Sequence, residues 1–246
     1  YSGNSNHGKV MLFLGTADGV DTDVHRIWHG THQGDYFGNS VSGDVDINGD
    51  GYHDIIVGAP YFDHDRSDTG RAYVFFGGVN MATSNSADST ANLIVEHADR
   101  NDDGGQSSDN FGSSVTGLRD VNGDGYDDFL IGAPSEDSSN AGRNEGRIYL
   151  YYGGANPNSN PDWVYTFSQQ NEYFGSTIAN AGDVNGDGLG DFFVGAYNSG
   201  QGGSARGLVA VFHGRVGNTP SLATQLFGQA NGEYAGYRIA SNCDVN

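Results

Sequence analysis

The stretch Tyr36–Pro60 reads YFGNSVSGDVDINGDGYHDIIVGAP, and it determines how the rest of the chain is interpreted. It recurs as NFGSSVTGLRDVNGDGYDDFLIGAP over Asn110–Pro134 and as YFGSTIANAGDVNGDGLGDFFVGAY over Tyr173–Tyr197. A shorter version, YAGYRIASNCDVN, occupies Tyr234–Asn246. In all four copies an aspartate stands eight residues after the same glycine, which indicates a repeated structural unit.

Each unit contains segments typical of short strands. The apolar run that ends in Gly-Ala, Ile55–Ala59 in the first unit, is bounded by turn residues, as buried strands are. A glycine-flanked segment follows it, GRAYVFFG at Gly70–Gly77, and related segments begin at Gly8, Gly146 and Gly207. A weaker strand segment precedes each repeat glycine, at His25–Trp28, Leu93–Glu96, Trp163–Thr166 and Thr224–Phe227.

This pattern predicts an all-β fold, a β-propeller of four-stranded blades. Units of about 60–75 residues match one blade, whereas the rival β-solenoid has shorter repeats. Blades packed around an axis bury faces that a lone four-stranded sheet would expose. We expect three full blades plus partial ones. The segment Asn80–Asn110 is longer than its counterparts and is rich in Ser, Asn and Asp, so it is expected to be an exposed loop.

The chain is out of phase with its repeats. It starts at the third strand of one unit and stops within the fourth aspartate-rich loop. We therefore expect residues 1–246 to form one propeller segment, incomplete at both ends, with the remainder in a parent chain.

Three complete loops, Asp46–Asp54, Asp120–Asp128 and Asp183–Asp191, carry Asp, Asn, Asp and Asp at positions 1, 3, 5 and 9. These are hard oxygen donors, a glycine at position 6 permits a sharp turn, and position 7 can offer its carbonyl. A set of oxygen donors without His or Cys favours Ca²⁺ over zinc, copper or Mg²⁺, with about one ion per loop. The predicted ligands are Asp46, Asn48, Asp50, Tyr52, Asp54, Asp120, Asn122, Asp124, Tyr126, Asp128, Asp183, Asn185, Asp187, Leu189 and Asp191, with Asp244 and Asn246 beginning a fourth loop.

The loop is not an EF-hand. Position 12 would need Glu, but Val57, Ile131 and Val194 stand there, and a strand rather than a helix is expected to follow. One such loop alone could be an ordinary Asn-Gly or Asp-Gly turn. Three copies with oxygen donors at all four positions favour a metal site, which we expect to be structural.

The overall charge narrows the choice of partners. The chain has 31 acidic and 11 basic residues and a formal net charge of −20. Nucleic acid is not expected as a partner because phosphate binding needs a basic surface. No run approaches 18 apolar residues, so no direct membrane insertion is expected.

The order Phe-Gly, then Asp-x-Asn-x-Asp-Gly-x-x-Asp, then Gly-Ala-Pro resembles the FG-GAP repeat of the integrin alpha-subunit propeller. The resemblance spans almost the whole chain. It implies a seven-bladed propeller with calcium-binding hairpin loops, and an extracellular or cell-surface adhesion role. Two departures, Tyr197 for Pro and Ala235 for Phe, affect packing more than metal. An integrin partner subunit is not implied, because nothing in the sequence identifies a surface for it.

Three functions fit these observations. The first is a calcium-stabilised adhesion or recognition module for a protein or glycan ligand on a cell surface or matrix. The second is the accessory propeller of a secreted hydrolase or lyase, and the third is a structural repeat of an extracellular filament. No nucleophile elbow, P-loop or zinc-protease motif occurs, so the segment itself is not expected to be an enzyme. His25, His29 and His32 lie close together in sequence, but we expect them at the surface and at strand ends rather than on a metal.

Overall fold

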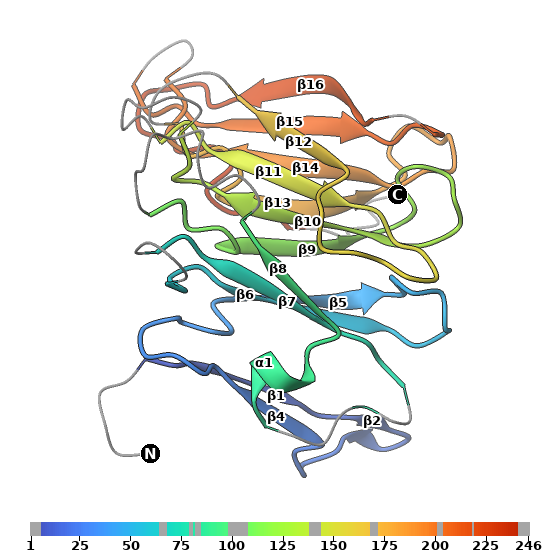
Figure 1. Ribbon diagram of the computed structural model, residues 1–246. Helices are drawn as coiled ribbons and strands as arrows, with labels where there is room; N and C mark the ends of the chain where they lie inside the picture. Colours follow the sequence, from blue (N-terminus) through green and yellow to red (C-terminus); the bar gives the residue numbers. More distant parts are fainter. Residues whose placement is uncertain are drawn as a thin grey trace.

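The computed structural model describes residues 6–63, 68–78, 81, 85–97, 108–137, 144–167, 172–200, 204–217 and 219–240. Within these ranges the chain forms three four-stranded and two two-stranded antiparallel sheets with one short helix (Figure 1). The prediction of an all-β fold with three complete blades is therefore confirmed. No helix among the described residues is long and apolar enough to cross a membrane.

The three complete blades share one strand order, in which each strand pairs with the next along the chain. The first blade contains β5 (Ser40–Val45), β6 (Asp54–Ala59), β7 (Arg71–Phe75) and β8 (Leu93–Glu96). The second contains β9 (Ser114–Leu118), β10 (Asp128–Ala133), β11 (Arg147–Tyr151) and β12 (Trp163–Thr166). The third contains β13 (Thr177–Gly182), β14 (Asp191–Ala196), β15 (Leu208–His213) and β16 (Ser221–Phe227).

The N-terminal part forms two smaller sheets. In one, β1 (Lys9–Leu12) pairs with β4 (Arg26–His29), and in the other, β2 (Gly15–Thr16) pairs with β3 (Gly19–Val20). β1 and β4 match the third and fourth strands of the later blades, as the repeat predicts.

The sheets stack face to face in chain order (Figure 1). The first strands lie closest together, since β5 contacts β9 and β9 contacts β13. This is the arrangement of propeller blades, whose first strands line the axis.

The glycines of the repeated motifs allow neighbouring blades to approach closely. A Cβ added to Gly58 would lie 2.0 Å from the carbonyl oxygen of Gly112 in the next blade. The equivalent distance is 2.2 Å both from Gly132 to the oxygen of Gly175 and from Gly195 to the oxygen of Gly236. The glycine of Gly-Ala therefore packs on the glycine of the next Phe-Gly, which explains why both motifs recur together.

The core between blades is aromatic. Phe129 and Tyr151 are cross-strand partners on β10 and β11, with ring centroids 4.8 Å apart. Phe192 and Phe212 form the equivalent stacked pair in the third blade, 5.1 Å apart. All four are essentially inaccessible to solvent, and such cross-strand pairs stabilise a sheet beyond simple burial.

The expectation of an exposed loop over Asn80–Asn110 is wrong for part of that segment. It contains the helix α1 (Ala87–Thr90) as well as β8, and Ala87 and Thr90 are buried. The polar composition of this helix does not predict burial. In the structure the hydroxyls of Ser89 and Thr90 both donate to the carbonyl oxygen of Ser86 within the same segment. Residues 82–84 and 98–107 lie outside the described ranges.

Candidate metal centres

Each of the three aspartate-rich loops connects the first and second strands of a blade. They join β5 to β6, β9 to β10, and β13 to β14, so every loop closes a hairpin and is followed by a strand. This arrangement confirms that the loops are not EF-hands. Because the first strands run in the same direction in Figure 1, the three loops emerge at the same end of the blades.

In the first loop the oxygens of positions 1 and 3 converge. The backbone N–H of Asp50 donates to Oδ1 of Asp46 at 3.0 Å and to Oδ1 of Asn48 at 3.0 Å. The N–H of Gly51 donates to the other carboxylate oxygen of Asp46 at 2.8 Å, and Gly51 has a φ of 85°. The loop is therefore curled around its first aspartate, and only glycine adopts this φ without strain.

The other two loops repeat this pattern at equivalent positions. The position 5 N–H donates to both the position 1 and the position 3 oxygens, at 3.1 and 2.9 Å in the second loop and at 3.0 and 2.9 Å in the third. The position 6 N–H donates to the position 1 carboxylate at 2.7 and 2.8 Å. The three loops therefore share one backbone geometry, as expected of a repeated structural unit rather than of unrelated turns.

The aspartate at position 9 is fully buried and ties the loop to the blade. Oδ2 of Asp54 accepts the N–H of Ile47 at 2.8 Å, and its Oδ1 accepts the N–H of Gly77, beyond the third strand, at 2.9 Å. Asp128 binds Val121 and Gly153 in the same way, and Asp191 binds Val184 and Gly214.

Burial disfavours the charged form of these carboxylates. Burial, opposed in part by the backbone N–H donors and assisted by neighbouring aspartates, raises the pKa of Asp54 to about 6 and that of Asp128 to about 8. The exposed Asp183 behaves differently, since the N–H of Gly188 and other backbone donors lower its pKa. Burial therefore raises the pKa of the ninth-position carboxylate in the first two loops, and a bound cation there would favour the ionised form.

The donor chemistry fits a hard cation. Asp46, Asn48 and Asp50, with their counterparts in the other two loops, place side-chain oxygens around one turn, and Asp54 stands at its base. In the described part of the chain, no three His, Cys, Asp or Glu side chains stand together at metal-holding spacing. The donor at position 3 is an asparagine, which is not one of these four residue types. The ninth-position carboxylate faces backbone N–H groups. The incomplete fourth loop, Asp244 and Asn246, lies outside the described residues.

A second set of acids, which the sequence analysis did not single out, also follows the repeat. Asp35, Asp109 and Glu172 stand three residues before the repeat glycine, and each is at most 5% exposed. Glu233 holds the same position in the fourth copy, but there it is exposed. The constant offset from the glycine was the available signal.

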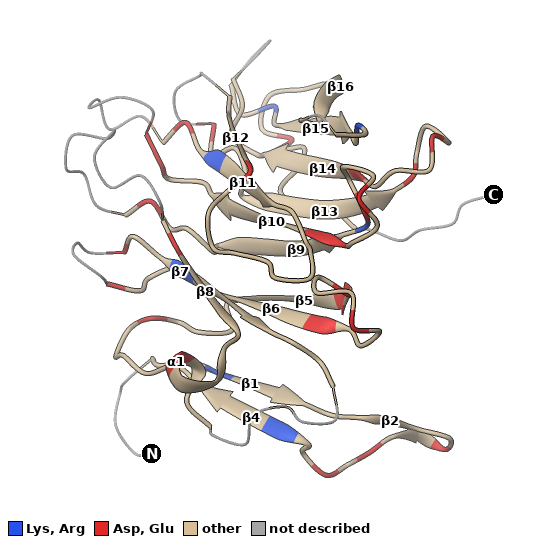
Figure 2. Ribbon diagram, turned by 45° about the vertical axis from the view of Figure 1, so that its right-hand side comes forward, with Lys and Arg blue, Asp and Glu red and all other residues tan. Residues whose placement is uncertain are grey.

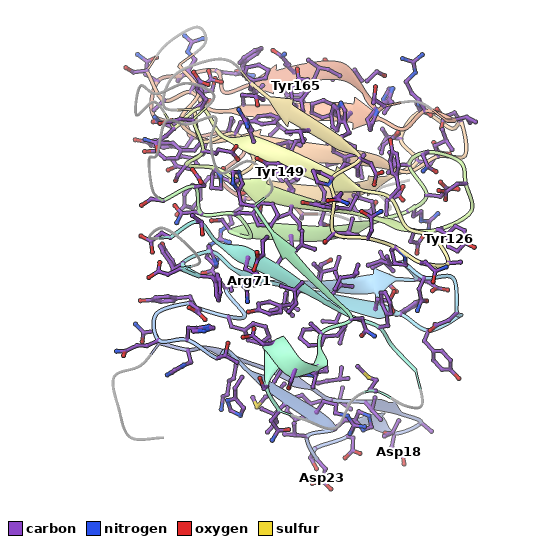
Figure 3. All side chains as sticks on the ribbon, viewed as in Figure 1. Asp18, Asp23, Arg71, Tyr126, Tyr149 and Tyr165 are labelled. Carbon is purple, nitrogen blue, oxygen red and sulfur yellow. The ribbon has the colours of Figure 1, made fainter. Side chains whose placement is uncertain are left out.

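One buried polar cluster links the first and second blades. Glu136 accepts hydrogen bonds from Tyr149 at 2.6 Å and from Arg147 at 2.7 Å, and it is inaccessible to solvent. Nε2 of His97, just beyond β8, lies 2.8 Å from the Tyr149 hydroxyl and 3.1 Å from Glu136. Figure 3 labels Tyr149 within the stack, and the cluster is structural in position rather than a surface site.

The three histidines near Trp28 belong to no group of three potential metal ligands among the residues that the structure describes. His29 ends β4, and His32 is exposed, with Nδ1 3.5 Å from Asp35. His25 is half-buried, and its N–H donates to the carbonyl oxygen of Leu12. These positions match the expectation of surface and strand-end residues.

Two tyrosine pairs lie at the end of the blades opposite to the aspartate-rich loops, one pair exposed and the other, Tyr173 and Tyr197, half-buried. Tyr36 and Tyr61 are 44% and 42% exposed, with ring centroids 5.0 Å apart. Tyr173 and Tyr197 stack at 5.3 Å in the third blade. Tyr36 and Tyr173 also adopt positive φ values of 53° and 55°, which are unfavourable for tyrosine.

Comparison with known proteins agrees with this geometry. The FG-GAP repeat family matches residues 37–75, 111–151 and 174–212. Each match begins at the Phe before the repeat glycine and ends within or just beyond the third strand of a blade. The chain belongs to the FG-GAP repeat family, and its sheets are blades of a β-propeller.

The similar proteins are integrin alpha subunits. The chain is 34% identical to human integrin alpha-11 over 197 residues, which cover 78% of this chain and 15% of that protein. It is 32% identical to Xenopus laevis integrin alpha-5 over 207 residues, 79% of this chain and 17% of that protein. Drosophila melanogaster integrin alpha-PS2 is 34% identical over 184 residues, 70% of this chain and 12% of that protein. The chain thus spans less than a fifth of the length of these relatives.

Proposed function

We propose that this propeller segment is a non-catalytic, extracellular recognition module whose hairpin loops bind structural Ca²⁺. The observation that carries the metal role is the threefold recurrence of one loop geometry, in which the same backbone N–H contacts the oxygens of positions 1 and 3. The predicted ligands of the first loop are Asp46, Asn48, Asp50, the carbonyl of Tyr52, and Asp54.

The cation would stabilise the closed conformation of the hairpin loop. It would neutralise the acidic loop while the ninth-position aspartate keeps its two backbone hydrogen bonds to the loop and to the third strand. Oxygen donors in this number suit Ca²⁺ better than Mg²⁺, which retains several waters. Loop closure therefore stabilises the blade rather than presenting the ion to a substrate.

The recognition role is supported by two tyrosine pairs, of which Tyr36 and Tyr61 are exposed and Tyr173 and Tyr197 are half-buried. Tyr36, Tyr61, Tyr173 and Tyr197 lie on the loops before the first strand and after the second, opposite to the metal loops. Exposed aromatic rings are enriched where proteins bind partners. The integrin alpha relatives supply the cell-surface setting, and the excess of acidic over basic residues, coloured on the ribbon in Figure 2, disfavours anionic partners.

The test is binding of the intact protein to arrays of matrix proteins and glycans, with calcium present. We expect a defined ligand for the native protein and loss of binding in the Tyr36→Ala/Tyr61→Ala variant. The control is Phe227→Ala, which removes an aromatic side chain that is 40% exposed on the outer strand β16. Equal loss in both variants, or no ligand on any array, would contradict the recognition role.

A further inference from the structure

The three metal loops contact one another in series. The backbone N–H of Asp127, position 8 of the second loop, donates to the carbonyl oxygen of Asp46 at 3.3 Å. The carboxylate of Asp127 accepts the N–H of Asp46 at 2.9 Å. Asp127 therefore clamps both backbone groups of the first predicted ligand in the neighbouring loop, although it is not a predicted ligand itself.

Further contacts hold the same two loops together. The ring of Tyr126 lies over Gly49, where an added Cβ would be 2.5 Å from its Cε1 atom. Gly154, beyond the third strand of the second blade, donates its N–H to the carbonyl oxygen of Ile47 at 2.8 Å. Figure 3 labels Tyr126 at the edge of the stack where these loops lie.

The junction between the second and third loops lacks the side-chain half of the clamp. Gly190 occupies position 8 there and donates its N–H to the carbonyl oxygen of Asp120 at 2.7 Å. A Cβ on Gly190 would lie 2.7 Å from the carbonyl oxygen of Arg119, so this junction has no room for an aspartate. The two junctions therefore differ by one carboxylate, which makes the second a natural comparison for the first.

We propose that Asp127 is a positioning residue that couples the first two loops, so that cation binding at the second loop raises the affinity of the first. This inference rests on the proposed calcium role. Binding would hold the backbone of the second loop in the conformation that places Asp127, at position 8, against the first loop. Asp127 then holds Asp46 in place, and the first loop loses less conformational freedom when it binds. By reciprocity, an occupied first loop strengthens the second by the same factor.

The chain contains a separate reporter for each loop. The amide N–H groups of Gly51, Gly125 and Gly188 each donate to the first aspartate of their own loop. Their ¹H–¹⁵N signals follow the occupancy of each loop during a titration with CaCl₂. Asp124→Ala disables the second loop, and Asp187→Ala, its match in the third loop, serves as the control.

Coupling predicts that Asp124→Ala weakens calcium binding at the first loop by roughly fivefold or more, whereas Asp187→Ala leaves it unchanged. In an Asp127→Leu background, Asp124→Ala should no longer affect the first loop. Asp127→Asn keeps an acceptor oxygen and should preserve most of the coupling, while Asp127→Ala, which removes the acceptor with less bulk, should abolish it.

The outcomes separate the two proposals. If the three glycine signals respond to calcium but the first-loop affinity is the same with and without the second loop, the coupling is wrong and the calcium role stands. Coupling that persists in both Asp127→Leu and Asp127→Ala would show that Asp127 does not transmit it. If no loop signal responds to millimolar CaCl₂, the calcium role and the coupling are both wrong.

Discussion

Oδ1 of Asp128 accepts the backbone N–H of Gly153 at 2.9 Å, which joins the aspartate-rich loop of the second blade to a residue just beyond its third strand. The same carboxylate accepts the N–H of Val121 at 2.7 Å. Equivalent bonds exist for Asp54 and Asp191. The ninth aspartate is therefore a structural residue even before any cation is considered.

Replacing this residue should destabilise the metal-free protein. Asp128→Ala leaves two buried N–H groups without their acceptor, and we expect the free energy of unfolding to fall by about 2–4 kcal/mol. Urea denaturation in excess chelator measures this. The control, Asp124→Ala, removes an exposed carboxylate of the same loop and should cost less than about 1 kcal/mol. Equal losses would contradict the structural role of Asp128.

Stability of the metal-free protein should also fall with rising pH, while the gain in stability from calcium grows. An unfolded aspartate has a pKa of about 3.9, whereas the pKa is raised to about 6 at Asp54 and to about 8 at Asp128. The folded state therefore binds more protons, so these groups stabilise it most below about pH 4, and that contribution is lost as the pH rises through about 8.

Calcium competes with protons for the same oxygens. We expect the melting temperature in chelator to fall between about pH 4 and pH 8, and the increase produced by CaCl₂ to grow over that window. Thermal melts at several pH values test both trends. Asp128→Asn should flatten the slope in chelator, and a slope unchanged by this substitution would show that other groups cause it.

The glycine contacts between blades give an independent prediction about the fold. Gly132→Ala would place a Cβ 2.2 Å from the carbonyl oxygen of Gly175, and we expect a loss of about 2–3 kcal/mol in unfolding free energy. Gly15→Ala, where a Cβ meets nothing within 4 Å, should change stability little. Chemical denaturation of the two variants measures this difference. Similar stabilities would mean that blade spacing is not set by these glycines.

The buried cluster at the seam between the first two blades should be costly to break. Glu136→Leu removes the carboxylate that faces Arg147, Tyr149 and His97, and we expect destabilisation by about 3–5 kcal/mol. The control is Asp18→Asn, at an exposed loop residue labelled in Figure 3. If Glu136→Leu melts at the native temperature, the cluster does not hold the blades together.

Much of this architecture was predictable because the repeat is visible in the sequence. The offset from Gly38 to Asp46 recurs in every copy, and it located the hairpin loops and the strands on either side of them. The apolar run Ile55–Ala59 lies within β6, and Leu93–Glu96 is the outer strand of the same blade, as predicted.

Other features depend on tertiary contacts that a linear pattern does not contain. The helix Ala87–Thr90 has a polar sequence, and only its packing makes Ala87 and Thr90 buried. The clamp between Asp127 and Asp46 joins residues from different repeats, at a position where the other loops carry His53 and Gly190. The calcium ligands themselves remain a prediction, because the donor types and loop geometry suit the ion without demonstrating it.

Thermal unfolding of the intact protein in millimolar CaCl₂ and in excess chelator tests whether calcium stabilises the hairpin loops. If calcium fastens the hairpin loops, one site at a hundredfold excess over its dissociation constant adds about 2.7 kcal/mol, so we expect the melting temperature to rise by at least about 5 °C. A variant with Asp50, Asp124 and Asp187 all replaced by Ala should lose that rise. Identical melting of the native protein in calcium and in chelator would contradict the account.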